Sequence, residues 1–315
     1  MRKNLSLLIS LAIGFLFTSM LWQLAEPKII TAIGKAFYTV TKTSFIEIPT
    51  TDAQGIPMRY YPRVGTVYDP EYVAMESIRN YNTRIEPNRE KRFLQLSEWL
   101  VNQVDSTGLI PQNYDFRDAS LLKPWYSAAT QSAAMLAIAQ RAGFLRDRKL
   151  LGISSGMLAK LDPGYGYISS AETDSTVWFK SYPDYAIRGM VQTLLNLYEY
   201  DKLVNDPLAK DLFAKGVRML NYKLGSLENR GYLDDPYMHI GRRAEHQELT
   251  RLLDELIKIA PNRFLAQDIE RYKKLDKLPV SYQMLDQYAW GRIFCAMLGW
   301  MLFTLVIHAF LKMPK

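Results

Sequence analysis

The stretch "SAATQSAAMLAIAQRAG", from Ser127 to Gly143, decides the fold class of this chain. Its apolar residues recur at the three- and four-residue intervals of one helix face, as Ala133 and Ala137 do. A helix with such a face buries it against neighbouring elements. The stretch therefore predicts a helix in the core of a helical domain.

Segments with the same periodicity lie on both sides of this stretch. Upstream, one begins near Pro70 and a second spans residues 93–104. Downstream segments, separated by loops rich in Gly, Pro, Asn and Asp, cover 147–161, 185–201, 207–224, 245–260 and 262–274. About eight helices in sequential pairs build either a solenoid or an α/α toroid, and no fixed repeat of about 34–47 residues favours the solenoid. We therefore predict a mainly α fold, with an α/α barrel (toroid) of about four helical hairpins.

Both ends of the chain are apolar enough to cross a membrane. The first uncharged span runs from Asn4 to Ala25, and the second, "IFCAMLGWMLFTLVIHAFL", runs from Ile293 to Leu311. At about 1.5 Å per residue, each approaches the roughly 30 Å of a bilayer core. Because the first span lacks a clear small-x-small cleavage site, we interpret it as an anchor rather than a signal peptide. Basic residues at both ends then place the two termini in the cytoplasm and the main domain outside it.

Residues 36–62, "AFYTVTKTSFIEIPTTDAQGIPMRYYP", break the helical pattern. They are rich in β-branched and aromatic residues and are interrupted by Pro and Gly, so they predict a short hairpin or small sheet. The chain is divided accordingly into an N-terminal transmembrane anchor (1–26), a small β region (27–68), an α/α-barrel domain (69–285), and a C-terminal transmembrane helix with a short basic tail (286–315).

The composition of the 315-residue chain narrows the choice of partner. Its net charge of +7 is scattered, so the clustered basic face of a nucleic-acid-binding protein is missing and no nucleic-acid partner is expected. A basic balance suits an anionic polymer or an anionic membrane surface. With one cysteine, Cys295, and three histidines, no metal site is expected, and nothing in the sequence indicates an organic cofactor.

Several loops between the predicted helices are rich in aromatic residues. They are "LIPQNYDF" (109–116), "KPWYS" (123–127), "DPGYGY" (162–167), "WFKSYPD" (178–184) and "RGYLDDPYMHI" (230–240). Sugar rings stack on aromatic side chains while neighbouring polar groups bind their hydroxyls. Tyr and Trp in loops can equally cover the ends of a helical core with an apolar body and a polar tip. So many aromatic loops together favour a saccharide site at one end of the barrel.

At these loops the chain resembles the D-glucuronyl C5-epimerase family, whose members invert C5 of glucuronic acid within a polysaccharide. The matching segments are "DAQGIP" (52–57), "FLQLSEWLVNQVDSTGLIPQNYDF" (93–116), "PWYSAATQSAAMLAIAQRAG" (124–143), "VWFKSYPD" (177–184), "RGMVQTLLNLYEYDKL" (188–203) and "AKDLFAKGVRMLNYKLG" (209–225). The resemblance covers roughly Asp52 to Leu275. It implies a small β region followed by an α/α barrel.

The chemistry of that family sets demands that can be stated independently. The hydrogen at C5 is very weakly acidic and lies next to a carboxylate, so an enzyme must neutralise the carboxylate with a cation and hold a base on one face and an acid on the other. The family typically has two consecutive glutamates before Tyr-Pro, one of them implicated in catalysis. This chain has Lys180 and Ser181 there, followed by Tyr182 and Pro183.

The resemblance implies Tyr182 and Tyr232 as the catalytic pair, although a shift of one residue matches Leu233 instead of Tyr232. If His246 is the second histidine of the family, Arg242-Arg243 replaces a Tyr-His pair. The predicted substrate-binding residues are Trp125, Tyr126, Gln131, Trp178, Lys180, Arg242 and Arg243.

Two of these assignments have structural alternatives. Gln131, in the alanine-rich helix, either binds a sugar hydroxyl or is a satisfied core amide. Arg242 and Arg243 either hold a carboxylate or lie on the solvated face of a helix start.

Three functions follow from these residues. The first is a membrane-anchored D-glucuronyl C5-epimerase-like enzyme with a relocated base, in which Arg242 or Lys180 holds the substrate carboxylate. The second is a catalytically degenerate subunit that binds an acidic polysaccharide beside a membrane polysaccharide synthase or exporter. The third is a glycoside hydrolase or lyase, whose two carboxyls lie about 5–9.5 Å apart. Its carboxyls would come from loop residues that also serve as caps or turn formers, namely Asp162, Asp174, Asp184, Asp234 and Asp235.

Overall fold

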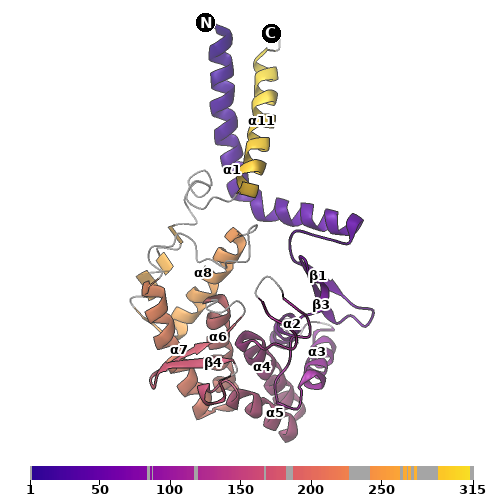
Figure 1. Cartoon of the computed structure of the whole chain (residues 1–315), viewed down its shortest axis with the longest axis vertical. Helices are drawn as coiled ribbons and strands as arrows, with labels where there is room; N and C mark the ends of the chain where they lie inside the picture. The colour runs from indigo at the N-terminus through magenta and orange to yellow at the C-terminus, as the bar shows by residue number, and fades with distance from the viewer. Residues whose placement is uncertain are drawn as a thin grey trace.

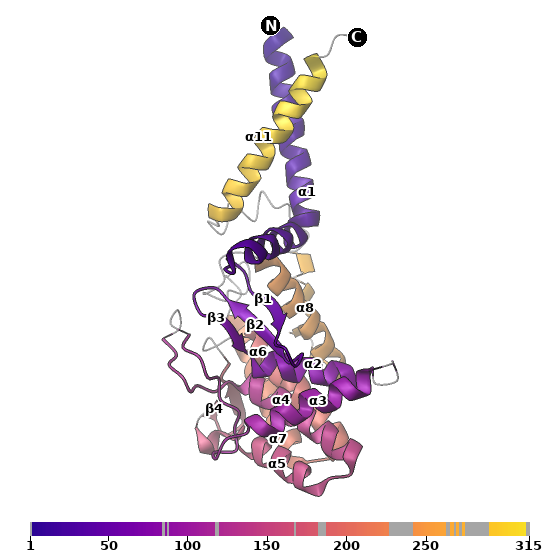
Figure 2. The same cartoon turned by 90° about the vertical axis from the view of Figure 1, so that its right-hand side faces the viewer.

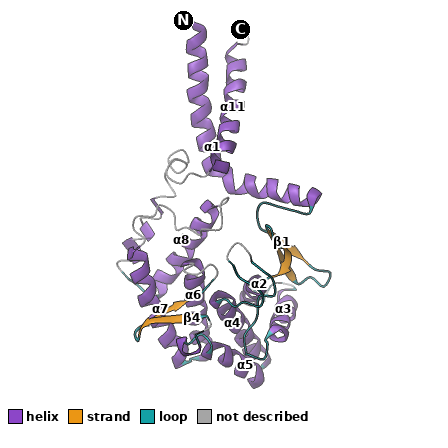
Figure 3. Cartoon of the chain, in the orientation of Figure 1, coloured by secondary structure: helices purple, strands orange, loops and turns teal. Residues whose placement is uncertain are grey.

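The computed structural model describes residues 2–83, 86, 88–116, 120–166, 168–181, 187–226, 242–262, 265–267, 269–270, 273–274 and 290–312. Across these residues the chain is mainly helical, with a few short strands (Figure 3).

Four helices form a row in which each contacts the next: α2 (Pro70–Asn82), α4 (Ala128–Leu145), α6 (Ile187–Val204) and α8 (Arg242–Ile259). Three more pack beside this row: α3 (Arg89–Gln103), α5 (Arg148–Ala159) and α7 (Pro207–Ser226) (Figures 1 and 2). This alternation is consistent with an α/α-barrel-like fold and confirms the helices predicted between residues 147 and 260 to within a few residues. Closure of the row into a ring stays a prediction, and the predicted helix at 262–274 lies partly outside the described residues.

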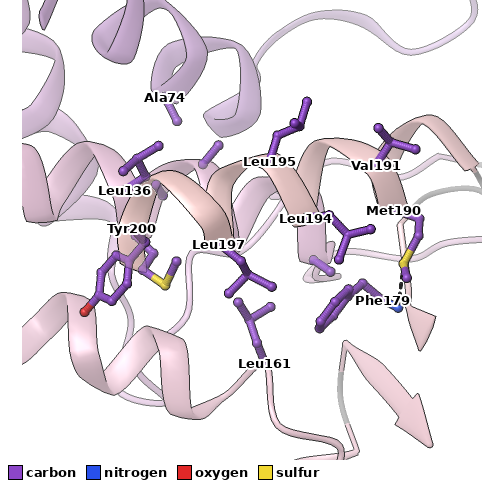
Figure 4. Packing of buried hydrophobic residues seen from close by; sticks show 14 of the residues in the cluster. Ala74, Leu136, Leu161, Phe179, Met190, Val191, Leu194, Leu195, Leu197 and Tyr200 are labelled. Carbon is purple, nitrogen blue, oxygen red and sulfur yellow. Dashed lines mark hydrogen bonds between the residues drawn. The ribbon is translucent and has the colours of Figure 1, made fainter. Parts of the chain in front are cut away.

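The alanine-rich helix α4 forms the centre of the core. Ala133 and Ala137 are fully buried, and α4 contacts α2, α3, α5 and α6. Small side chains let helices approach closely, and the larger residues of neighbouring elements fill the remaining space. Figure 4 shows this packing, in which Leu197 and Tyr200 of α6 lie near Leu161 and Leu136. The stretch that predicted the fold is therefore the element around which the helices assemble.

Leu197 gives a direct test of this core. Its side chain is fully buried, whereas Leu203, six residues later in the same helix, is 41% exposed. We expect Leu197→Ala to lower the free energy of unfolding by about 2–5 kcal/mol, because it removes buried contacts and leaves a cavity. The control Leu203→Ala should change it by no more than about 0.5 kcal/mol. Urea unfolding of the full chain measures both, and equal losses would contradict the assignment of the core.

Two small antiparallel sheets accompany the helices. β1 (Ile48–Thr51), β2 (Pro57–Tyr61) and β3 (Gly65–Tyr68) pair in that order, with Ile48 opposite Tyr60 and Arg59 opposite Val67. β4 (Ser169–Thr173) and β5 (Thr176–Phe179) form a hairpin that packs on α7 and α6, and a short 3₁₀ turn, η2 (Pro163–Tyr165), precedes it. The first sheet confirms the predicted small β region.

The β region is shorter than predicted. Residues 27–41 continue the helix α1 (Arg2–Thr41) instead of joining the sheet. The β-branched and aromatic residues at 36–41 misled the prediction, because tertiary contacts override strand propensity. Tyr38 packs its ring on Tyr60 with centroids 5.1 Å apart, and its hydroxyl lies 3.2 Å from Thr66 Oγ1. The sheet thus holds this segment as a helix laid across it.

The first part of α1 runs beside α11 (Trp290–Lys312), and the two chain termini lie at the same end of the molecule (Figures 1 and 2). Trp300 Nε1 donates to the carbonyl of Leu11 at 2.8 Å. Small residues bring the helices close, since a Cβ added to Gly14 would lie 2.7 Å from Thr304 Oγ1 and one added to Gly299 would lie 3.2 Å from Thr18 Cγ2. Searched over the described residues alone, the helices include none long and apolar enough to cross a membrane.

Candidate functional site

Polar side chains from six parts of the chain meet on one partly exposed surface. They come from the segment before β1, from β2, from the start of α2, from the loop before α4, and from α6 and α8. We name this set the charged-tyrosine cluster, and its members are Glu47, Arg59, Tyr61, Asp69, Glu71, Tyr114, Arg188 and Glu248.

Strand β2 supplies the first cation of the cluster. Because side chains alternate along a strand, Arg59 and Tyr61 share one face, while Tyr60 points to the opposite face and packs on α1. Arg59 Nη1 lies 3.1 Å from Glu47 Oε2 and 3.5 Å from Asp69 Oδ2. The guanidinium therefore joins two carboxylates that are far apart in the sequence.

Asp69 joins this strand to a helix. Its Oδ1 accepts the backbone N–H groups of Glu71 at 3.0 Å and Tyr72 at 3.3 Å, which caps the N-terminus of α2. Its Oδ2 accepts a short hydrogen bond of 2.6 Å from the hydroxyl of Tyr61. With Pro70 at the first helical position, the local sequence fixes where α2 begins and hence where both groups sit.

The second cation, Arg188, lies in the first turn of α6. Its Nη2 is 3.3 Å from Glu71 Oε1 on α2, and its Nη1 is 3.7 Å from Glu248 Oε1 on α8. Its side chain is 43% exposed, against 24% for Arg59, so Arg188 is the cation more open to a ligand.

Aromatic rings form one wall of the cluster. Tyr61 stacks on Tyr114 at 5.8 Å between centroids and meets Phe116 edge-on at 5.9 Å. Trp125 lies behind this wall, where its ring meets Tyr114 at 5.5 Å and its Nε1 donates to the carbonyl of Tyr114 at 2.9 Å. Trp125, which we predicted to bind substrate, is 9% exposed and holds Tyr114 in place.

Four groups of the cluster have pKa values above their ordinary ones. Burial raises the pKa of Glu47, and the charge of Arg59 does not offset this effect. Burial likewise raises the pKa of Glu71 against the charge of Arg188. Burial and the nearby Asp69 raise the pKa of Tyr61 well above its usual value, and the same causes raise the pKa of Tyr114. Two carboxyls of raised pKa and two protonated tyrosines thus share one surface.

Other predicted substrate-binding residues are packed in the structure. Gln131 is fully buried and its amide exchanges two hydrogen bonds with the backbone of Ile110, at 2.9 and 2.7 Å. Trp178 is 2% exposed and belongs to the core. The hydroxyl of Tyr126 donates to Asp105 Oδ2 at 2.7 Å. In the structure these three side chains are therefore held by contacts within the protein. Gln131 has the geometry of the predicted alternative, a core amide whose hydrogen bonds are satisfied.

Within the motif "WFKSYPD" (178–184), the structure describes residues 178–181. The backbone of Lys180 bonds to Ile168 and Ala128, and its side chain is half-buried. Ser181 is 4% exposed, and its Oγ accepts the N–H of Ala129 at 3.3 Å. A Cβ on Gly189 would overlap Ser181, so Gly189, next to Arg188 in the sequence, lies directly against Ser181.

The side chains of the remaining predicted residues fall outside the described part of the chain. Tyr182 and Tyr232 are not described, and Arg242 and Arg243 lie at the start of α8 with undescribed side chains. For the hydrolase alternative, Asp162 caps η2 by accepting the N–H of Gly164 at 2.8 Å. Asp184, Asp234 and Asp235 lie outside the described residues.

No member of the charged-tyrosine cluster was predicted as a site residue. The available signals were the alternation of Arg59 and Tyr61 in a short predicted strand and the helix-start signature of Asp69, Pro70 and Glu71. The prediction concentrated on aromatic loops. It missed the cluster because Arg188 joins α6 to α2 and α8, and contacts between segments so far apart in the sequence become visible only in three dimensions. Within the described part of the chain, no three His, Cys, Asp or Glu side chains are placed to hold a metal ion together.

Glu47 allows a test of the electrostatics. A raised pKa in the folded state means that its stabilising contribution is complete below pH 4.5, the ordinary value, and is lost as pH rises through the raised pKa. We therefore expect the free energy of unfolding to fall less steeply with rising pH over this interval in Glu47→Gln than in the unmodified chain. Urea unfolding at a series of pH values measures the slope. The control is Glu90→Gln on the exposed face of α3, and an unchanged slope in Glu47→Gln would refute the raised pKa.

Gly189 tests whether close packing holds the motif beside Arg188. An added methyl group would collide with Ser181, so Gly189→Ala should lower the free energy of unfolding by about 1–3 kcal/mol. Gly152, in the helix α5, has open space around it, and Gly152→Ala should instead be stabilising by about 0.4–1 kcal/mol. Thermal or urea unfolding compares the two variants, and the same sign of change in both would contradict the packing.

Comparison with known proteins gives distant matches. No protein-family model matches the sequence, and no curated protein sequence matches it. Among solved structures, the GH76 α-mannanase of Bacteroides thetaiotaomicron is similar with 11% identity and a TM-score of 0.40, over 84% of this chain and 72% of that chain. Cellobiose 2-epimerase from Bacillus thermoamylovorans has 11% identity and a TM-score of 0.40, over 84% of this chain and 74% of that chain.

Proposed function

We propose that this protein is a membrane-anchored enzyme that removes and returns the proton at C5 of uronic acid residues in a polysaccharide outside the cytoplasm. The observation that carries the proposal is the charged-tyrosine cluster, which combines cations, carboxyls of raised pKa and protonated tyrosines on one partly exposed surface. These are the three kinds of group that exchange at C5 requires.

The cation in this proposal is Arg188. A uronate carboxylate that binds its guanidinium takes the place of Glu71 or Glu248, the present partners at 3.3 and 3.7 Å. A bidentate arginine contact suits a carboxylate and withdraws charge from the neighbouring C5. Binding of substrate to Arg188 also frees Glu71 from its ion pair.

Glu71 is then the base and Tyr61 the acid. The pKa of Glu71 is raised by burial, which makes its carboxylate a stronger base than an exposed one. Tyr61 stays protonated and holds its proton in a hydrogen bond to Asp69. Asp69 also accepts the backbone N–H of Glu71, so one carboxylate holds the Tyr61 hydroxyl and the backbone that carries Glu71.

Tyr182 and Tyr232 keep the catalytic roles that the family resemblance implies, as a second pair to be tested. Ser181, which directly precedes Tyr182 in the sequence, touches Gly189, the neighbour of Arg188 in the sequence. Lys180, Arg242 and Arg243 are further candidates for the substrate carboxylate, and an acidic polysaccharide is the partner that such basic groups suit.

A binding subunit is the second candidate function, and one observation favours it. Lys180 and Ser181 stand where the resemblance places two glutamates, one of them implicated in catalysis, and the hydroxyl of Ser181 accepts the backbone N–H of Ala129. A chain that kept the cluster for binding and lost its catalytic carboxylate would serve a membrane polysaccharide synthase or exporter. Membrane anchoring belongs to both candidates and is supported by the uncharged sequences at residues 4–25 and 293–311.

Incubation of the full chain, in detergent, with an unsulfated glucuronic acid polymer in D2O measures deuterium uptake at C5. We expect uptake in the unmodified chain and a loss of about 10²–10⁴-fold in Glu71→Gln and Tyr61→Phe, because each removes a proton-transfer group. Arg188→Gln should lower uptake mainly through a higher KM. The matched controls are Arg251→Gln and Tyr222→Phe, whose side chains are largely exposed and lie outside the cluster.

The outcomes separate the candidates. Uptake that persists in Glu71→Gln and Tyr61→Phe but is lost in Tyr182→Phe moves the chemistry to the Tyr-Pro motif. No uptake, with polymer binding that Arg188→Gln weakens, establishes the binding subunit. Neither uptake nor binding overturns the proposal.

A further inference from the structure

We infer that the last third of α1, residues 28–41, lies along the surface of an anionic membrane and holds the charged-tyrosine cluster next to it. This inference rests on the membrane anchoring of the proposed function. It concerns a different segment from the two spans, namely the part of α1 that turns away from α11 and crosses the molecule between the helix pair and the first sheet (Figures 1 and 2).

α1 bends between the part that packs beside α11 and the part that lies above the first sheet (Figure 1). Pro27 lies within α1, and a proline inside a helix removes a backbone donor and kinks the axis. The first part follows α11, whereas residues 28–41 run steeply across the direction of that pair (Figure 1). If the pair crosses a bilayer, the remaining part of α1 lies in the plane of its surface.

One face of residues 28–41 is covered by protein. Gly34 lies so close to Ile46 that a Cβ would collide with its side chain. Tyr38, one turn further, packs on Tyr60 and reaches Thr66. These contacts fix the rotation of the helix about its own axis.

The fixed rotation leaves an apolar stripe uncovered. Ile33, Phe37 and Val40 follow the four- and three-residue spacing of one helix face and are 53%, 49% and 84% exposed. Lys28 and Lys35 are exposed on the same segment. A helix with an exposed apolar stripe and lysines on its polar face is the kind that lies in the interface between lipid headgroups and acyl chains.

Lipid is the occupant that fits both parts of α1 and α11. The helix pair exposes large apolar side chains, with Leu16 67%, Leu302 64% and Leu305 65% exposed. An apolar covering must therefore continue from the pair onto Ile33 and Val40, as a bilayer does. The positive charges of Lys28 and Lys35 on this segment complement anionic lipid headgroups.

The arrangement also brings the candidate site close to the membrane. Tyr60 of β2 packs on Tyr38, while its neighbours Arg59 and Tyr61 belong to the charged-tyrosine cluster. A single strand thus links the surface segment to Arg59 and to the proposed acid, Tyr61. The substrate class that this placement suits is a uronic acid polymer that lies close to the membrane surface.

Single-cysteine labelling of the full chain tests the inference. In a Cys295→Ser background, cysteines are introduced one at a time by Val40→Cys, Ile33→Cys, Leu16→Cys and Tyr222→Cys, the last on the exposed face of α7 as a control. Each is labelled with a polarity-sensitive fluorophore in vesicles of phosphatidylcholine, with and without phosphatidylglycerol. A lipid-borne quencher reports contact with acyl chains.

We expect the labels at positions 16, 33 and 40 to shift to the blue and to be quenched from the lipid, and the label at 222 to do neither. At positions 33 and 40 the shift should grow with phosphatidylglycerol and lose that growth in the double variant Lys28→Gln and Lys35→Gln. A buried label at 16 with water-exposed labels at 33 and 40 would overturn this inference and leave the anchoring intact. A water-exposed label at 16 would overturn the anchoring, and this inference with it.

Discussion

The carboxylate of Asp69 is the interaction on which the candidate site depends. One of its oxygens caps α2 and the other accepts the hydroxyl of Tyr61, while Arg59 approaches it from β2. A buried carboxylate is stable only when its oxygens are paired, and here the pairing joins a strand to a helix. The position of Tyr61, the start of α2 and the direction of Glu71 all follow from this one group.

A second constraint organises the helices around α4. Its alanines keep the neighbouring helices close, so that α2 and α6 lie on either side and Arg188 of α6 can reach Glu71 of α2. The site is thus a consequence of core packing, since two helices far apart in sequence place opposite charges within 3.3 Å. Arg188 extends the connection to Glu248 of α8 and links three members of the row.

The helices from α4 onwards were predictable because their apolar spacing is long and regular. The β region was predicted in kind but not in extent, since residues 36–41 have strand-forming side chains and yet pack as a helix on Tyr60. The site was harder to predict. Trp125, Gln131 and Trp178 have the residue types of a saccharide site, and all three are buried in the structure. No sequence pattern distinguishes a buried residue of these types from one that binds a sugar. The cluster depends on contacts between β2, α2, α6 and α8, which no local signal contains.

The central claim is that the cluster transfers protons at C5, and Asp69→Asn tests it most directly. Asparagine caps a helix about as well as aspartate. Loss of the buried charge that pairs with Arg59 and Tyr61 should lower the free energy of unfolding by about 1–3 kcal/mol, since Glu47 still pairs with Arg59. Asparagine carries no charge and holds the hydroxyl of Tyr61 less strongly. The measurement is deuterium uptake at C5 of a glucuronic acid polymer by the full chain, made together with its urea unfolding. We predict uptake by the unmodified chain and a large loss in a stably folded Asp69→Asn variant, whereas equal uptake by the two chains would contradict the account.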